Sequence, residues 1–571
     1  MSVSKVFVFG LDGATFDLIL PWAAEGKLPH FSRLLAEGCW APLESVPNMR
    51  SAAAWTSFIT GKNPGKHGIF EFYEPIPGTY EVRFIHGGMR EGKSLWAILS
   101  QLNKRVGVIN VPMTYPAEEV NGFLIAGLDA PSPESPYFCY PAELSQELHA
   151  RFGPYILEPG LTGCLIGGKP DAAVQKFHEE LEQKEKITAY LMQKYPWDFF
   201  MVVFRSLDAV QHCFWKHMDP FHPHHNPAEA KRYGSVILKA YQKIDKTLGT
   251  IRAALDEDTA LIVMSDHGFG RKHPASNQLN RWLASQGFLH YLDDRGPGTA
   301  LRHLLTSLFG HTYRLLVGKT SRRVKQKLAR RFPQLRNRLQ SRLCLANIDW
   351  SRTKAYSDTL FPNIRVNLEG REPKGIVNPG EDYYQLIDEI RQGLVESRDA
   401  VSGRQIVDRV FHRDELYTGP LVEKAPDLLI RWKEDEEIHG IALADGALDS
   451  ALPEESRPLV PGEDPHVISG DHRLFGVLLM AGKPIRRGVQ CSPARLIDLA
   501  PTILQLLKLP IPSAMDGRVL TEVFQEGIIS THAPFRINEV LETSDHQADE
   551  GYSVEEEKAI AQRLRDLGYV D

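Results

Sequence analysis

The sequence predicts an α/β fold built on a mostly parallel sheet that is sandwiched by helices. Short apolar runs rich in β-branched residues alternate along the chain with longer amphipathic segments. Such alternation is typical of parallel strands joined by crossover helices. Two of the runs are apolar at every position and end in polar turns, as expected for strands buried within a sheet.

The expected elements follow one another in a regular order. The first strand, 5–10, ends at Leu11-Asp12-Gly13, and the strongest strand, 260–264, ends at Ser265-Asp266-His267-Gly268. The other expected strands are 106–111, 199–204, 428–431 and 474–480, and the expected helices are 31–37, 94–102, 228–255 and 494–507. We find no internal repeats.

Length and composition bound the class of protein. The 571 residues suffice for one large domain with insertions or for two to four domains, and a net charge of -6 points to no particular partner. Six scattered cysteines without a CxxC pair argue against a disulfide framework or a structural zinc knuckle. Neither a secretory signal nor an apolar run long enough to span a bilayer is recognisable, so we expect a cytoplasmic enzyme.

The stretch 49–70 predicts a short buried helix that begins at Ser51. Ala52-Ala53-Ala54-Trp55 follows the hydroxyl, and the run 60–65 (TGKNPG) ends the helix. Backbone N–H groups and the helix dipole favour negative charge at a helix N-terminus. Ser51 is therefore either a helix cap or a nucleophile for an anionic substrate.

Three acidic residues come just after predicted strands: Asp12, Asp208 and Asp266. Ligands of open α/β sheets bind outside the carboxyl ends of the strands. Any one of these aspartates alone fits an ordinary turn or helix cap equally well.

Histidines accompany these aspartates at spacings typical of metal ligands. Asp208 and His212 are four residues apart, so they share one face of a helix. His267 is adjacent to Asp266, and His472 precedes the strand 474–480. Carboxylate oxygen and imidazole nitrogen together suit zinc or manganese better than calcium. Two such ions would clamp an in-line displacement at phosphorus, and one would activate a serine nucleophile.

Five motifs in the same order as in a known family carry a resemblance. They are FGLDGAT (9–15), AAWTSFITGKNPGKHGIF (53–70), LDAVQHCFW (207–215), MSDHGFG (264–270) and SGDHRLFGVLLMAG (469–482). The chain resembles the alkaline phosphatase superfamily, and within it the type I phosphodiesterase/nucleotide pyrophosphatase branch. The resemblance implies an alkaline-phosphatase-like core.

The resemblance also implies roles for single residues. Asp208, His212 and His472 would hold one zinc ion, and Asp12, Asp266 and His267 the other, with Ser51 bridging toward it. Ser51 would form a phospho-seryl intermediate that water hydrolyses. Related sequences often have Thr-Pro-Pro-Ala-Trp-Thr-Ser where this chain has SAAAWTS (51–57), so the nucleophile is Ser rather than Thr.

Two further residues of this stretch have alternative interpretations. Arg50 is either a substrate-binding residue that contacts a phosphate oxygen or a solvated arginine. His67 is expected to order the loop rather than to bind metal.

A basic segment interrupts the α/β pattern. Thirteen Lys or Arg residues and no Asp or Glu lie between Arg295 and Asn347. We predict an inserted basic helical cap, 291–347, in a discontinuous catalytic core of 1–290 and 348–571. The cap is either a solvated lid or a surface that attracts an anionic substrate, an anionic membrane or another polyanion.

The sequence thus predicts a hydrolase of phosphoric ester bonds. We expect a dinuclear metal enzyme that cleaves a phosphodiester or pyrophosphate bond in a small phosphorylated substrate. The alternatives are a phosphomonoesterase or phosphomutase of the same superfamily, or a membrane-surface binding protein with a degenerate site. The substrate, the choice of zinc or manganese and the oligomeric state stay open.

Overall fold

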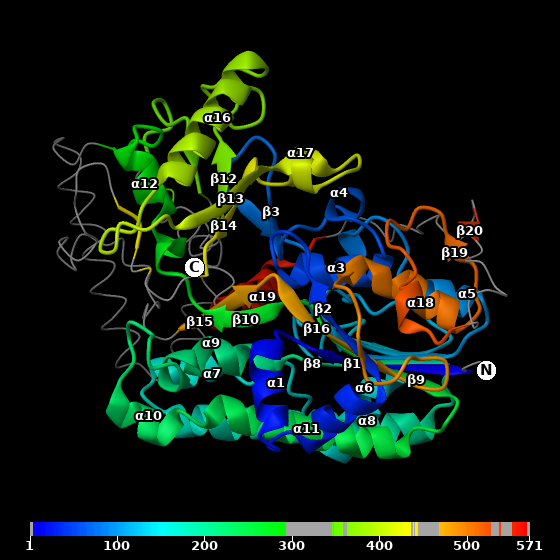
Figure 1. The fold of residues 1–571 in the computed structure, drawn as a ribbon. Helices are drawn as coiled ribbons and strands as arrows, with labels where there is room; N and C mark the ends of the chain where they lie inside the picture. Colours follow the sequence, from blue (N-terminus) through cyan, green and yellow to red (C-terminus); the bar gives the residue numbers. More distant parts are fainter. Residues whose placement is uncertain are drawn as a thin grey trace.

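A ten-stranded sheet forms the centre of the protein (Figure 1). The computed structural model describes residues 4–292, 345, 348–357, 362–434, 438, 440–442, 468–526, 536–537 and 551–567. The strand order is β17-β2-β16-β9-β1-β8-β5-β6-β7, and β18 also pairs with β2. The bounds are β1 Lys5–Leu11, β2 Cys39–Glu44, β5 Val106–Val111, β6 Gly122–Ala126, β7 Cys139–Tyr140, β8 Phe199–Phe204, β9 Thr259–Ser265, β16 Phe475–Ala481, β17 Val489–Gln490 and β18 Ala494–Arg495.

The middle of this sheet is parallel. Strands β9, β1, β8, β5 and β6 pair in parallel, whereas β16 runs antiparallel to both β9 and β2. The predicted α/β fold with a mostly parallel sheet is therefore confirmed.

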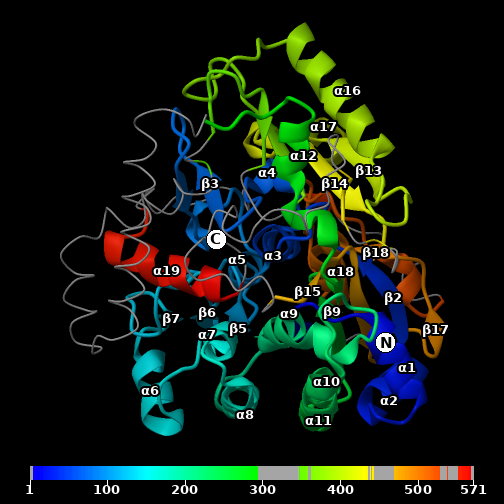
Figure 2. The same ribbon diagram turned by 90° about the vertical axis from the view of Figure 1, so that its left-hand side faces the viewer.

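Helices cover both faces of the sheet (Figures 1 and 2). The layer drawn below it contains α1 Phe16–Ala24, α2 Pro29–Glu37, α6 Glu143–Phe152, α7 Leu161–Ile166, α8 Pro170–Lys194, α9 Ser206–Met218, α10 Pro227–Tyr233 and α11 Val236–Ala254. The layer above it contains α3 Ser51–Thr60, α4 Pro64–His67, α5 Leu95–Gln101 and α18 Leu499–Leu506. None of the helices in the described part of the chain is long and apolar enough to cross a membrane.

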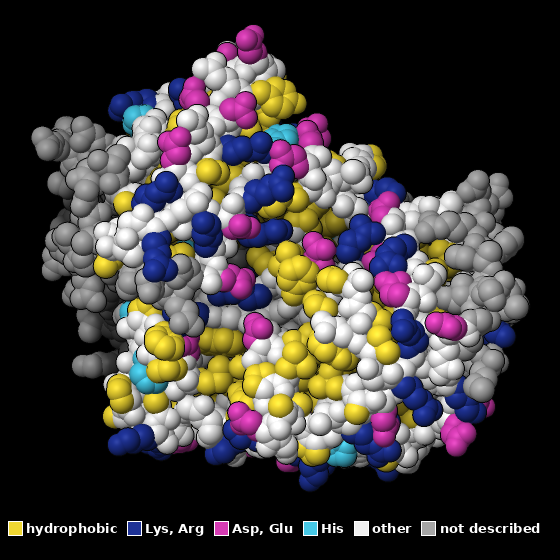
Figure 3. Space-filling view, viewed as in Figure 1, with side chains coloured by type: hydrophobic (Ala, Val, Ile, Leu, Met, Phe, Trp, Pro, Cys, Tyr) yellow, Lys and Arg dark blue, Asp and Glu magenta, His cyan; other side chains and the backbone are white. Residues whose placement is uncertain are grey.

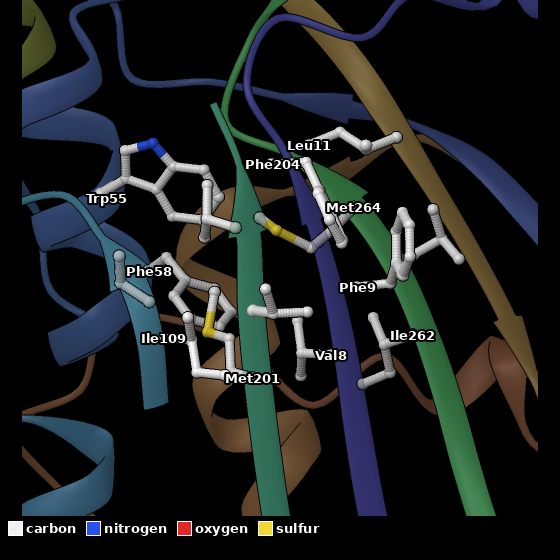
Figure 4. Packing of buried hydrophobic residues seen from close by; sticks show 14 of the residues in the cluster. Val8, Phe9, Leu11, Trp55, Phe58, Ile109, Met201, Phe204, Ile262 and Met264 are labelled. Atoms are coloured by element: carbon white, nitrogen blue, oxygen red, sulfur yellow. The ribbon is translucent and has the colours of Figure 1, made fainter. Parts of the chain in front are cut away.

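Helix α3 is anchored in the core by two aromatic side chains. Trp55 and Phe58 are fully buried and lie against strands of the central sheet (Figure 4). Gly10 of β1 allows this close approach, because a Cβ atom there would lie 3.2 Å from Trp55 Cη2 and 2.8 Å from Val203 Cγ2. The packing holds the helix that begins at Ser51 firmly on the sheet.

We expect Trp55→Ala to lower the free energy of unfolding by ~3–5 kcal/mol, because it removes a large buried side chain and leaves a cavity. Urea denaturation followed by circular dichroism measures the loss. Phe221→Ala is the control: Phe221 is 64% exposed, so its loss is expected to change the free energy by less than ~0.5 kcal/mol. Equal effects of the two substitutions would contradict this account of the α3 anchor.

A second hydrophobic core, formed by residues between 275 and 441, lies above the central sheet in Figure 1. It surrounds an antiparallel four-stranded sheet in the order β11-β12-β14-β13. Its elements are α12 Leu279–Ser285, β11 Ala355–Tyr356, β12 Asn363–Val366, α16 Glu381–Glu396, β13 Val407–His412, α17 Arg413–Leu416 and β14 Leu428–Trp432.

This second lobe was not anticipated from the sequence. The predicted strand 428–431 exists as β14 but lies in the second sheet, because apolar patterning identifies a strand without identifying its sheet. The predicted basic cap, 291–347, lies almost entirely outside the described residues.

Two predicted helices have different bounds in the structure. The predicted helix 228–255 is wrong as a single element, because Gly234 ends α10 and α11 starts at Val236. A Cβ atom on Gly234 would lie 3.0 Å from the carbonyl oxygen of His217, so the chain breaks where it packs against the end of α9. The predicted helix 494–507 begins only at Leu499, because residues 494–495 pair with β2 as strand β18.

Short elements complete the described fold. They include the hairpin of β3 Tyr73–Pro75 and β4 Val82–Phe84, the pair of β10 Gly268–Arg271 and β15 Gly470–Arg473, the pair of β19 Ile511–Pro512 and β20 Arg536–Ile537, and helix α19 Val554–Asp566.

Candidate metal centre

Three neighbouring strands end at the same level of the sheet. Leu11 of β1 pairs with Phe204 of β8 on one side and with Ser265 of β9 on the other. The chain therefore leaves all three strands at one edge, which is where open α/β sheets bind ligands. The acidic side chains that follow are Asp12 after β1, Asp266 after β9 and Asp208 in the first turn of α9.

The antiparallel strand β16 brings His472 to the same edge. Because β16 runs opposite to β9, its first residue lies near the end of β9. The preceding strand β15 pairs with β10, and His472 stands opposite Phe269. As a result, the rings of His472 and His267 stack with their centroids 3.6 Å apart.

Helix α3 points its first turn at this edge. Met49 adopts the left-handed backbone conformation, with φ 51°, just before the helix. The N-cap position belongs to Arg50, so Ser51 is not the cap but the first helical residue. Ser51 is fully buried, and its Oγ lies 3.2 Å from Nε2 of His267.

The predicted ligand residues form two groups of three. Within each group, the candidate ligand atoms all lie within 4.8 Å of one another. In the first group, Nε2 of His212 is 3.3 Å from Oδ1 of Asp208 and 3.1 Å from Nε2 of His472. In the second, Nε2 of His267 is 3.4 Å from Oδ1 of Asp12 and 3.4 Å from Oδ2 of Asp266. All six side chains are buried.

Backbone carbonyls fix the orientation of all three histidines. The Nδ1 atoms of His212, His267 and His472 lie 2.8, 2.9 and 2.7 Å from the carbonyl oxygens of Gly470, Gly268 and Met49. A carbonyl can only accept, so each Nδ1 donates a proton and each Nε2 is the ring nitrogen that faces the interior of the site. The sequence did not predict the roles of these three residues, because every residue has a backbone carbonyl whatever its side chain.

Comparison with known proteins identifies the family. Residues 6–430 match the model of the type I phosphodiesterase / nucleotide pyrophosphatase family. The chain belongs to this family. It is therefore a hydrolase of phosphoric ester bonds.

The chain is similar to several solved structures at low sequence identity. Phosphonoacetate hydrolase from Sinorhizobium meliloti 1021, in complex with phosphonoformate, is 13% identical with a TM-score of 0.50, over 89% of this chain and 96% of that one. Murine ectonucleotide pyrophosphatase / phosphodiesterase 5 is 12% identical with a TM-score of 0.46, and the match covers 91% of this chain and 100% of that one. Alkaline phosphatase PafA is 13% identical with a TM-score of 0.49, and the match covers 92% of this chain and 99% of that one. No curated protein sequence matched the chain.

The donor set of this phosphodiesterase-family chain fits divalent cations. Among the described residues, both carboxylate oxygens of Asp12 and Oδ2 of Asp266 are buried and accept no hydrogen bond. Burial and the nearby Asp208 carboxylate raise the pKa of Asp12, and burial with Asp12 raises the pKa of Asp266 well above its usual range. Burial opposes protonation of His267, yet Asp266 and Asp12 raise its pKa to about 10. A bound cation would stabilise the charged form of these buried carboxylates.

Arg50 is not a solvated arginine, since its side chain is only 2% exposed. Its Nε donates a hydrogen bond to a carboxylate oxygen of Glu71. The predicted contact of Arg50 with a phosphate oxygen stays a prediction. Glu71 was missed, because no sequence spacing links it to Arg50.

His67 lies outside both ligand groups. Its Nδ1 accepts a hydrogen bond from the N–H of Ile69 at 3.2 Å, and its Nε2 lies 2.8 Å from Oγ of Ser57. Burial lowers the pKa of His67 to about 3, so the ring is neutral. These contacts tie helix α3 to the loop that follows it, the role expected from the sequence.

Proposed function

We propose that the chain is a dinuclear metal-dependent hydrolase that cleaves a phosphodiester or pyrophosphate bond through a phospho-seryl intermediate. One observation carries the proposal: the Ser51 hydroxyl starts a buried helix 3.2 Å from His267, beside two adjoining groups of candidate ligands. This arrangement combines a nucleophile, an anion-binding helix N-terminus and donors for two cations.

The ligand groups divide between two ions. Asp208, His212 and His472 would hold one, and Asp12, Asp266 and His267 the other. The mixed nitrogen and oxygen donors favour zinc, with manganese as the alternative. When bound, the ions supply Lewis acidity, which lowers the pKa of the nucleophile and stabilises the leaving oxygen.

Ser51 enters the reaction as the alkoxide, with its proton released to solvent. Its Oγ forms a bond to phosphorus while the bond to the leaving oxygen breaks, and the leaving alcohol takes a proton from water. The first N–H groups of α3, which have no partner within the helix, favour the anionic phosphoryl oxygens. Water then attacks from the opposite side, restores the Ser51 hydroxyl and releases the phosphate product.

Metal analysis and paired assays test this proposal. We expect one ion per ligand group, two per chain, and a kcat/KM for bis-p-nitrophenyl phosphate at least about tenfold above that for p-nitrophenyl phosphate. A preference for the monoester would favour a phosphomonoesterase or phosphomutase instead. Absence of bound metal together with no turnover of either ester would favour a membrane-surface binding protein.

A further inference from the structure

A pocket opens beside the first turn of α3, one residue from Ser51. It is lined by Met49 and Arg50 and by residues of β3, β12 and β14. Met49 also faces the metal centre, because its carbonyl accepts the hydrogen bond from Nδ1 of His472. The pocket is therefore in position to hold a substituent of a phosphoryl group attacked by Ser51.

The pocket wall is mostly apolar, and its charged side chains carry both signs, with Arg50 paired to Glu71 and Lys424 paired to Glu74. The apolar part includes Phe70, Tyr73, Ile85, Leu429 and Ile430. Figure 3 shows hydrophobic side chains bordered by basic and acidic ones in the middle of this face, below the second lobe. Such a wall suits a neutral, partly apolar group better than a second phosphate.

Glu71 lines the same pocket and is held in place by Arg50, the residue that precedes Ser51. One of its carboxylate oxygens accepts a hydrogen bond from Nε of Arg50, and the other accepts one from the N–H of Phe72 at 2.9 Å. Arg50 is 2% exposed and Glu71 13%, so the pair is mostly desolvated. Together they bring a fixed carboxylate and no net charge to the nucleophile.

The electrostatic interaction of a substrate with the Glu71 carboxylate depends on the charge of the substrate. A phosphodiester carries one negative charge, and its second ester group is neutral. A phosphomonoester dianion, or a pyrophosphate, carries further anionic oxygens that would enter the pocket toward Glu71. The Glu71 carboxylate repels such a group and also offsets the charge of Arg50, so replacing the carboxylate by an amide would leave a positive charge to attract it.

We propose that Glu71 is a specificity-determining residue that selects monoanionic phosphodiesters with a neutral, partly apolar ester group over dianionic monoesters and pyrophosphates. This inference rests on the proposed function of Ser51 and the two ligand groups. It narrows the substrate class to diesters of uncharged alcohols.

Glu71→Gln tests the proposal in the metal-loaded full chain. The ratio of kcat/KM for p-nitrophenyl phosphate to that for bis-p-nitrophenyl phosphate is expected to rise by at least about tenfold, because the repulsive charge is gone. Glu74→Gln is the matched control, since Glu74 lines the same pocket but pairs with Arg83 and, at 3.1 Å, with Lys424. In Glu74→Gln, the ratio of the two kcat/KM values is expected to stay within about twofold of that of the unaltered protein. An unchanged ratio in Glu71→Gln would overturn the proposal.

Binding to the unaltered protein gives a second readout that depends neither on the fold of a variant nor on turnover. Calorimetric titration compares phenylphosphonate, a dianion at pH 9, with its monomethyl ester, a monoanion. We expect the monoanion to bind at least about fivefold more tightly. Tighter binding of the dianion would refute the role of Glu71.

The two proposals fail in different ways. If the unaltered protein hydrolyses diesters through Ser51 while the ratio is unchanged in Glu71→Gln and the dianion binds more tightly than the monoanion, only the specificity inference is wrong. If it hydrolyses neither ester, the proposed function is wrong, and the binding order still decides whether Glu71 discriminates by charge.

Discussion

Ser51→Ala is expected to lower kcat for the preferred ester by at least about 10³-fold and to abolish the covalent phosphoenzyme. The reason is that Oγ of Ser51 is the atom proposed to attack phosphorus, and methyl cannot replace it. The fold should persist, because Ala is a better helix former than Ser and residues 52–54 are already alanines. Rapid acid quenching followed by mass spectrometry of the peptide that contains α3 measures the phosphoenzyme directly.

The same helix supplies the control. Ser57 lies in α3 beyond Ser51, but its hydroxyl is 2.8 Å from Nε2 of His67. The Thr56 hydroxyl donates to the carbonyl of Ala52 at 2.7 Å and so points into the helix. Ser57→Ala should therefore retain the phosphoenzyme, although the loss of its hydrogen bond costs ~1 kcal/mol of stability. Phosphate found on Thr56 or Ser57 would show that the nucleophile has been assigned to the wrong residue.

The parts of the site that follow strands could be predicted from the sequence. Asp12 and Asp266 come directly after apolar runs, and parallel strands that end together must bring such residues to one edge. Asp208 and His212 needed only helical spacing in addition.

His472 was predicted as a ligand from the resemblance and not from strand order, since it reaches the site because β16 runs antiparallel and apolar patterning does not reveal strand direction. Other parts could not be predicted, because they depend on tertiary contacts. The carbonyls that orient the histidines and the Arg50–Glu71 pair depend on contacts between segments far apart in the chain or in different loops. The second lobe was missed because its strands are short or carry charged residues, so that only 428–431 stood out as an apolar run.

The division of the ligands into two groups predicts that substitutions in each group have separate effects on metal content and a large effect on activity. Asp208→Asn is expected to empty the site of the first group and Asp266→Asn that of the second, so each variant should retain one ion and the double variant none. Asn keeps the shape of the side chain but removes the charge, and the N–H of Gly13 can still donate to Oδ1 at position 266. Loss of one ion removes several kcal/mol of transition-state stabilisation, so kcat/KM should fall by ~10²–10⁴-fold.

Elemental analysis of the purified variants, with activity measured in parallel, distinguishes this result from a general loss of structure. Asp245→Asn is the control, because Asp245 is also a buried carboxylate but belongs to neither ligand group and accepts hydrogen bonds from the N–H groups of His30 and Phe31, at 3.2 and 2.7 Å. It should lower stability and leave the metal content unchanged.

If either single substitution released both ions, the two groups would form one interdependent centre, since the Asp208 carboxylate acts electrostatically on Asp12 and Asp266 as well as on its own histidines. If neither released an ion, the six residues would not be the ligands, and the buried carboxylates would have to be stabilised by protonation instead.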